Sequence, residues 1–137
     1  MNDPKKLKVS INSFSYKKGI PEDPTGNGGG FVFDCRGILN PGRYERYMYL
    51  TGKDSEVIEF FRKNSRIDEF LGKVVAVVDI TVQCYIERGF TDLMINFGCT
   101  GGQHRSVYCA ENFSRLLQEK YGVTVSIKHH EIDGAIK

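Results

Sequence analysis

The sequence has no long apolar run, few cysteines and little net charge, and each of these absences excludes a class of protein. No stretch approaches the roughly 18 uninterrupted apolar residues that a membrane-spanning helix needs. The first six residues lack the apolar run of a signal peptide, so we expect no export. A net charge of +2 does not support a broad nucleic-acid-binding surface, although it leaves room for a local one.

The cysteines do not indicate a metal site. They are Cys35, Cys84, Cys99 and Cys109. No two of them stand at C-x-x-C spacing, and no Cys/His set has the spacing of a zinc site, so we expect no metal ion and no cofactor. Free thiols within apolar segments suit a reducing compartment, which predicts a cytoplasmic protein.

The apolar periodicity predicts an α/β fold in a single small domain over residues 1–137, with a mixed sheet of about four strands flanked by about three helices. The expected strands cover residues 7–16, 31–35, 93–99 and 123–127. The expected helices cover 56–63, capped by Asp54 or Ser55, 67–88, ended by Gly89, and 107–121, ended by Gly122. Glycine and proline fill residues 19–30, which we expect to form a flexible loop within the domain.

The most informative segment is the loop Cys99-Thr100-Gly101-Gly102-Gln103-His104-Arg105-Ser106, which follows the third expected strand. Ligands of open α/β sheets bind beyond the carboxyl ends of the strands. Paired glycines let backbone N–H groups approach an anion, and the next helix adds its unpaired N–H groups and positive dipole end. Arg105 supplies a forked donor for two phosphate oxygens, and Thr100, His104 and Ser106 supply further donors. We predict a phosphate-binding loop; the alternative is a glycine turn with Arg105 on the surface and Ser106 as a cap.

The same loop contains C-x5-R-S, the pattern of cysteine-dependent phosphatases. In such enzymes a thiolate attacks phosphorus while the arginine binds the phosphate oxygens, and a helix dipole with Arg105 would activate Cys99. No motif marks a general acid, and Gly98 stands where these phosphatases usually carry a histidine. The candidates for the acid are Asp34, Asp54 and Asp133. The sequence therefore favours binding over catalysis and keeps a Cys99-dependent phosphatase as the alternative.

Five stretches, in order along nearly the whole chain, carry a further resemblance. They are SFSYKKGIP at 13–21, FVFDCR at 31–36, NP at 40–41, LTGKD at 50–54 and GCTGGQHRSVY at 98–108. Together with Lys128-His129 they resemble the C-terminal domain of the RapZ family, bacterial adaptor proteins that combine binding of nucleotides, sugar phosphates and small RNAs. The string Cys-Thr-Gly-Gly-x-His-Arg-Ser-Val-Tyr is the most specific part of the match.

The resemblance implies a piece of a sugar-phosphate kinase fold that senses glucosamine-6-phosphate and binds regulatory RNA without catalysis. It implies a pocket where Lys17, Asp34, Arg36 and the loop 99–106 converge, with His129 nearby. The expected ligand is an amino-sugar phosphate or a nucleotide, and the expected partners are RNA, a second copy of the chain or a separate nucleotide-binding domain. Simpler interpretations stay open: Asp34 and Arg36 could pair with each other, and Lys17 and His129 could be surface residues.

Two features depart from the RapZ pattern. The chain has no G-x-x-x-x-G-K-[ST] loop, so ATP binding of the Walker type is not carried over. Its tail, residues 129–137, is nearly neutral, whereas RNA-binding members end in a tail dense in Lys and Arg, and the RNA prediction is weaker for it. The run of arginines and tyrosines at 43–49 could stack on bases, but a surface turn that buries its tyrosines is the favoured interpretation.

Overall fold

The computed structural model describes residues 3–133, so the expected domain of residues 1–137 extends beyond the described range at both ends. The strands are β1 (Lys8–Ser15), β2 (Phe31–Asp34), β3 (Asp92–Cys99) and β4 (Thr124–His129). The helices are α1 (Ser55–Asn64), α2 (Ile67–Arg88) and α3 (Arg105–Tyr121), with short 3-10 turns at Pro4–Lys6, Pro41–Arg43 and Glu45–Tyr47. The prediction of a small α/β domain with four strands and three helices is confirmed.

The sheet has the order β2-β3-β1-β4, and every neighbouring pair of strands is parallel. The sequence predicted a mixed sheet, and this detail was wrong. Each connection returns the chain to the starting end of the sheet before the next strand begins: residues 16–30 after β1, α1 and α2 after β2, and α3 after β3. Parallel strands require such crossovers, and the short turns that would indicate antiparallel hairpins are missing between these strands.

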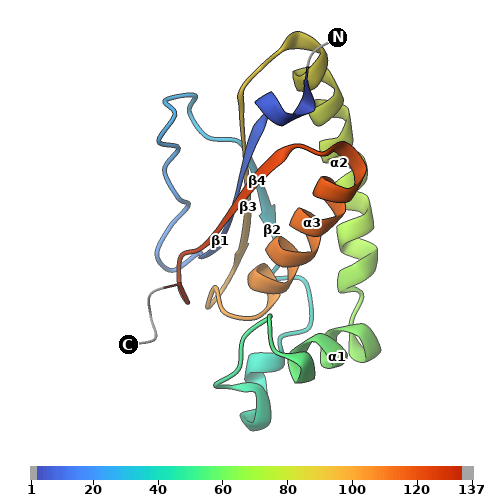
Figure 1. The fold of residues 1–137 in the computed structure, drawn as a ribbon. Coiled ribbons are helices and arrows are strands. Elements are labelled where there is room, and N and C mark those ends of the chain that lie inside the picture. Colours follow the sequence, from blue (N-terminus) through green and yellow to red (C-terminus); the bar gives the residue numbers. More distant parts are fainter. Residues whose placement is uncertain (1–2, 134–137) are drawn as a thin grey trace.

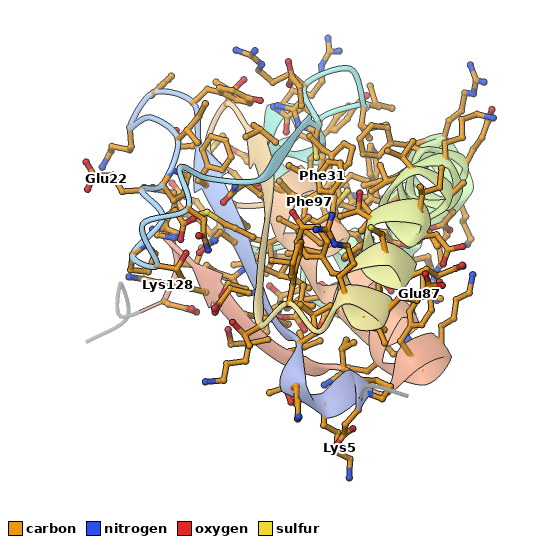
Figure 2. The ribbon with its side chains drawn as sticks, turned by 90° about the horizontal axis from the view of Figure 1, so that it is seen from above. Lys5, Glu22, Phe31, Glu87, Phe97 and Lys128 are labelled. Carbon is orange, nitrogen blue, oxygen red and sulfur yellow. The ribbon has the colours of Figure 1, made fainter. Side chains whose placement is uncertain are left out.

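Helices α2 and α3 lie over one face of the sheet, and the segment 16–30 lies on the other side (Figure 1). Helix α1 lies beyond the carboxyl ends of the strands. Alternate residues of the central strands point toward the helices and are buried there, Val9 and Ile11 in β1 and Ile95 in β3 among them. Figure 2, seen from above, places Phe31 and Phe97 at the centre of the molecule. The helix-covered face therefore carries the hydrophobic core.

The helix-free face carries a row of amide side chains in place of an apolar core. Asn12 Nδ2 donates to Asn96 Oδ1 at 3.1 Å, and Asn96 Nδ2 donates to the carbonyl oxygen of Phe31 at 3.0 Å. The ring Nε2 of His130 donates to Asn12 Oδ1 at 2.8 Å. These bonds connect three neighbouring strands and the turn after β4, so the polar side chains of this face satisfy one another.

Two helices show how local sequence sets their limits. The bounds predicted for α2 are confirmed, and Gly89 ends the helix in the left-handed conformation with φ 71°. Helix α3 begins at Arg105, two residues before the predicted start, because its first two residues, Arg105 and Ser106, are polar and give no apolar signal. Asp54 precedes α1, but its Oδ2 accepts from the Thr51 amide at 2.7 Å and makes no side-chain bond to the helix.

The remaining segments are irregular. Residues 19–30 contain no helix or strand, as predicted, while their flexibility stays a prediction. In the run 43–49, Tyr47 is buried but Tyr44 and Tyr49 are exposed, so the turn buries only part of its tyrosines. Across residues 3–133, no helix combines the length and the apolarity that a membrane crossing would need.

Candidate anion-binding site

The carboxyl ends of β1, β2 and β3 meet at one edge of the sheet, and the chain leaves that edge through residues 100–104 to enter α3 (Figure 1). The strand register places Ser15 opposite Cys99 and Asp34 opposite Gly98. Three segments that lie far apart in the sequence therefore converge at the edge where open α/β sheets bind their ligands.

Residues 100–104 present backbone N–H groups that the surrounding backbone does not use. Outside the helices and strands of residues 3–133, none of the backbone-to-backbone hydrogen bonds is donated by an amide of these five residues. The N-cap residue of α3 is His104, and its side chain makes no capping hydrogen bond. The first-turn amides of a helix have no acceptor within the helix, so unpaired donors gather here at the positive end of the dipole.

The glycines of this region have different roles. Gly102 has φ +67°, and a Cβ there would lie 2.5 Å from Cγ of Glu131 and 2.9 Å from the backbone of β1. A Cβ at Gly98 would lie 2.5 Å from the ring of Phe14. A Cβ at Gly101, in contrast, would meet nothing within 4 Å. Gly98 and Gly102 thus let the loop pack against β1, and Gly101 is the glycine left open to a ligand.

Arg105 is buried, with 5% of its surface exposed, so the alternative that placed it on the surface was wrong. Its Nη1 donates to the carbonyl oxygens of Arg36 and Ile38, each at 3.0 Å. Its Nε is buried and has no hydrogen-bond partner among the described residues. A buried donor without an acceptor costs about 1–3 kcal/mol. Arg105, the residue that follows the uncommitted amides of the loop, therefore keeps one unsatisfied N–H.

Cys99 and Ser106 close the loop at its base. Cys99 ends β3 on the core side and is 2% exposed, and its thiol donates to Ser106 Oγ at 3.2 Å. Ser106 is fully buried in the first turn of α3. Thr100, the next residue after the thiol, is exposed, and its carbonyl accepts from Ser15 Oγ at 2.5 Å. Of these polar side chains, only that of Thr100 lies at the surface.

Gln103 and His104 hold the loop against the segment 47–52. Gln103 Nε2 donates to the carbonyl oxygens of Met48 at 2.9 Å and Leu50 at 2.6 Å. His104 Nε2 donates to the carbonyl of Tyr47 at 2.9 Å, and burial lowers the pKa of His104 below 6.5, which keeps the ring neutral. The sequence predicted a ligand donor at His104 and assigned no role to Gln103. The sequence around Gln103 and His104 could not predict these hydrogen bonds, because the acceptors are backbone carbonyls more than 50 residues away.

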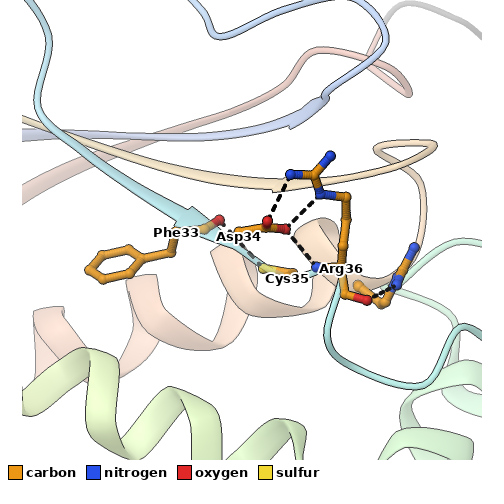
Figure 3. Close-up of polar contacts among 5 residues, drawn as sticks. Phe33, Asp34, Cys35 and Arg36 are labelled. Carbon is orange, nitrogen blue, oxygen red and sulfur yellow. Dashed lines mark hydrogen bonds and ion pairs between the residues drawn. The ribbon is translucent and has the colours of Figure 1, made fainter.

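Asp34 and Arg36 form an exposed ion pair at the same edge (Figure 3). Arg36 Nε and Nη2 donate to the two carboxylate oxygens at 2.9 and 2.8 Å, and the guanidinium lies 3.8 Å from the centre of the Tyr16 ring. These hydrogen bonds lower the pKa of Asp34 and raise that of Arg36. The pairing that the sequence left open is therefore present, and both side chains remain about half exposed beside the carbonyl that Arg105 binds.

The two other predicted ligand residues differ in burial. Lys17 is exposed after the end of β1, and its amide donates to Ser15 Oγ at 3.1 Å. His129 is 2% exposed; its Nδ1 bonds Ser13 Oγ at 2.6 Å and its Nε2 bonds a carboxylate oxygen of Glu111 at 2.7 Å. The structure thus brings Lys17 to the edge of the sheet and commits the ring of His129 to the interior.

Neither of two cavities elsewhere in the molecule includes a residue of the loop 99–106. Cavities of about 470 and 550 Å³ lie beside the segment 20–30 and share Asp23 and Gly29. Within residues 3–133, no three side chains of His, Cys, Asp or Glu are grouped so that they could hold a metal ion.

Comparison with known proteins gives a consistent match. Residues 7–133 match the family described as the RapZ C-terminal domain. The chain is 39% identical to a nucleotide-binding protein of Thermotoga neapolitana over 97% of this chain and 45% of the relative. It is 41% identical to a nucleotide-binding protein of Cereibacter sphaeroides over 93% of this chain and 40% of the relative. The chain thus spans less than half the length of these relatives.

Proposed function

Because the chain belongs to the family of RapZ C-terminal domains, we propose that it is a regulatory binding domain whose loop 99–106 holds the phosphate of a small ligand. Binding without turnover is the proposed activity. We also propose a cytoplasmic location, in line with the four cysteines, which are all free thiols.

The unsatisfied Nε of Arg105 is the observation that carries this proposal. The guanidinium is buried and fixed through Nη1 by two carbonyl oxygens, and its Nε has no acceptor among residues 3–133. Because a guanidinium always carries its charge, an anion is the ligand that would relieve both the missing hydrogen bond and the buried charge. The loop amides and the first turn of α3 would supply the remaining donors.

Two ligand classes follow from the relatives. The curated relatives are named nucleotide-binding proteins, and the RapZ resemblance implies an amino-sugar phosphate. Both carry the phosphate that we assign to the loop. The rest of either ligand would contact the exposed pair Asp34 and Arg36. Asp34 Oδ1 already accepts from the Arg36 amide and from Arg36 Nε, but Oδ2 accepts only from Arg36 Nη2 and keeps a lone pair for a hydroxyl or ammonium group.

RNA binding is a weaker expectation for this chain. The resemblance implies it, but a net charge of +2 gives no broad basic surface for phosphate contacts, which supply most of the affinity for RNA. A gel shift at low salt that disappears steeply with added salt would support it. The absence of a shift at low salt would remove RNA from the list of partners.

Calorimetric titration with inorganic phosphate, glucosamine-6-phosphate and adenosine monophosphate tests the proposal and ranks the ligand classes. We expect Arg105→Ala to weaken binding of the best ligand at least about tenfold, or about 1.4 kcal/mol. Arg115→Ala is the matched control, because Arg115 lies on the same helix with its side chain 56% exposed, and we expect unchanged affinity.

Since Arg105 is buried, a second variant separates loss of binding from loss of folding. Gly101→Asp adds a carboxylate where a Cβ meets no atom within 4 Å, so the fold should tolerate it while the anion is repelled. We expect the melting temperature of Gly101→Asp to match that of the wild type and its phosphate affinity to fall. Equal affinity of wild type, Arg105→Ala and Gly101→Asp would show that the loop is not the binding site.

A second candidate function is a Cys99-dependent phosphatase, and one contact favours it. Cys99 Sγ lies 3.2 Å from Ser106 Oγ, which could support a thiolate at the base of the loop. Gly98 weighs against it, because the histidine of those enzymes would place a Cβ 2.5 Å from Phe14. Release of phosphate from p-nitrophenyl phosphate that Cys99→Ser abolishes would establish the activity, and no release at high protein concentration would dismiss it.

A further inference from the structure

The turn 129–133 after β4 holds a carboxylate against the loop 99–106. The turn and the loop lie side by side at the same edge of the sheet (Figure 1), and a Cβ at Gly102 would lie 2.5 Å from Cγ of Glu131. Cγ carries the carboxylate directly, so the negative charge of Glu131 lies next to the loop backbone. Across residues 3–133, the amides of 100–104 donate to no other backbone group outside the helices and strands. A group that repels anions therefore lies beside the donors that would bind one.

Hydrogen bonds from backbone amides fix the turn that carries Glu131. The amide of Asp133 donates to the carbonyl oxygen of His129 at 2.9 Å, and the amide of His129 donates to Asp133 Oδ2 at 2.7 Å. The amide of His130 donates to the carbonyl oxygen of Ser13 at 2.9 Å, which ties the turn to β1. The side chain of Glu131 is only 19% exposed. Packing and these bonds therefore keep the carboxylate beside the loop.

The cations around Glu131 compensate its charge only weakly. Lys18 Nζ lies 3.7 Å from Glu131 Oε1, but the lysine side chain is 73% exposed. An ion pair this exposed contributes little, because water and salt screen it and the long side chain loses freedom. Burial lowers the pKa of His130, so the imidazole that follows β4 is neutral at about pH 8. Arg36, at the same edge of the sheet, is already paired with Asp34.

We propose that Glu131 is a specificity-determining residue, which shifts the preference of the loop 99–106 away from the doubly charged phosphate of a monoester and toward the singly charged phosphate of a diester. Since phosphate binding at this loop is the proposed function, the role of Glu131 rests on it. An ionised carboxylate offers a phosphate no donor, so its charge lowers the affinity. Specificity commonly depends on such an unfavourable contact with the disfavoured ligand.

The size of the repulsion depends on the charge of the ligand. Coulomb energy scales with the product of the two charges, so Glu131 repels a dianion twice as strongly as a monoanion at the same position. By the same rule Arg105 and the positive end of the α3 dipole attract the dianion more strongly than the monoanion. Glu131 offsets part of that preference. It lowers the affinity for a monoester without excluding it.

Titrations followed by the amide NMR signals of residues 100–104 test this role with two matched anions. Methyl phosphate is doubly charged at about pH 8, and dimethyl phosphate is singly charged. Glu131→Gln keeps the shape that packs on Gly102 and removes the charge. At constant ionic strength we expect Glu131→Gln to raise the affinity for dimethyl phosphate about threefold and that for methyl phosphate about tenfold, because the free-energy gain doubles with the charge.

Glu119→Gln is the matched control. Glu119 lies in the last turn of α3, at the end opposite the loop, with its side chain 66% exposed, and we expect both affinities to equal those of the wild type. Equal fold-changes for the two anions in Glu131→Gln would show that Glu131 acts through shape rather than charge and would overturn its proposed role. No change in either affinity would also overturn it, and the loop would remain the binding site if Arg105→Ala still loses both anions. Failure of both anions to bind the wild type and Glu131→Gln would contradict the proposed function, and the role of Glu131 with it.

Discussion

Two glycine-rich segments of this chain look alike in composition and are built differently. The loop 99–106 is enclosed: a Cβ at Gly102 would overlap Glu131 and β1, and Gln103 and His104 bond the backbone of the segment 47–50. The segment 19–30 is held mostly from within, since Asp23 accepts from the amides of Thr25 at 2.9 Å and Gly29 at 3.1 Å.

The comparison shows that glycine content does not by itself distinguish a rigid binding loop from a connecting segment. In the loop 99–106 distant parts of the chain fix the backbone, so its free N–H groups keep a constant arrangement for the anion that we propose. In the segment 19–30 the glycines at 26, 28 and 29 have positive φ and open surroundings. Gly30 is the exception there, because a Cβ would lie on the carbonyl oxygen of Met94.

The largest difference should appear when one glycine in each segment becomes alanine. Gly102→Ala combines left-handed strain with overlap, and we expect it to lower the free energy of unfolding by about 3 kcal/mol. Gly28→Ala has φ +85° but no atom within 4 Å of its Cβ, so strain alone should cost about 1 kcal/mol. Urea unfolding of both variants measures the difference. Equal losses would mean that the two loops are enclosed to the same degree.

The pH dependence of stability should reveal His104 in the enclosed loop. Burial holds the pKa of His104 below its ordinary 6.5, so below pH 6.5 the unfolded chain binds a proton that the folded chain does not. Stability is therefore expected to fall as the pH decreases from 6.5 toward the lowered pKa. We expect His104→Gln to flatten the profile of melting temperature between about pH 7.5 and 5.

A second histidine provides the comparison for that experiment. Burial also lowers the pKa of His130, so His130 should contribute to the same decrease of stability with falling pH. The His130→Gln variant should remove that contribution. The His104 and His130 variants together should give a flatter profile than either variant alone. A His104→Gln profile as steep as that of the wild type would show that the imidazole of His104 is not held neutral by the fold.

The smallest effect should come from Asp23 in the other segment. Hydrogen bonds from the Thr25 side chain, and then from backbone amides, hold the pKa of Asp23 below 3.8. The order that its carboxylate gives the segment should be present above that pH and be lost as the pH falls through the lowered pKa. We expect Asp23→Asn to speed hydrogen exchange at the Gly29 amide without changing the melting temperature. A change in exchange at Gln103 or His104 would show that the two loops are coupled.

Much of the fold could be predicted from local sequence, because its signals act within a few residues. The spacing of Leu71, Val74, Val78 and Val82 predicted α2, and Gly89 marked its end. The four strands and the position of the loop 99–106 after β3 were predicted in the same way. The parallel direction of every strand pair was missed, because direction depends on which strands become neighbours, and no local pattern records that.

In the candidate site, too, some features follow from adjacent residues and others depend on contacts between distant residues. The sequence by itself determined that two glycines and an arginine lie between a strand and a helix, which makes an anion loop plausible, since these are properties of adjacent residues. Only the tertiary structure decided that Arg105 is buried against the carbonyls of Arg36 and Ile38, that Gln103 and His104 fix the loop, and that His129 bonds Ser13 and Glu111 inside the protein. Hydrogen bonds to backbone carbonyls and side chains far along the chain form only when the packed core brings them within 3 Å, and a carbonyl is the same in every residue.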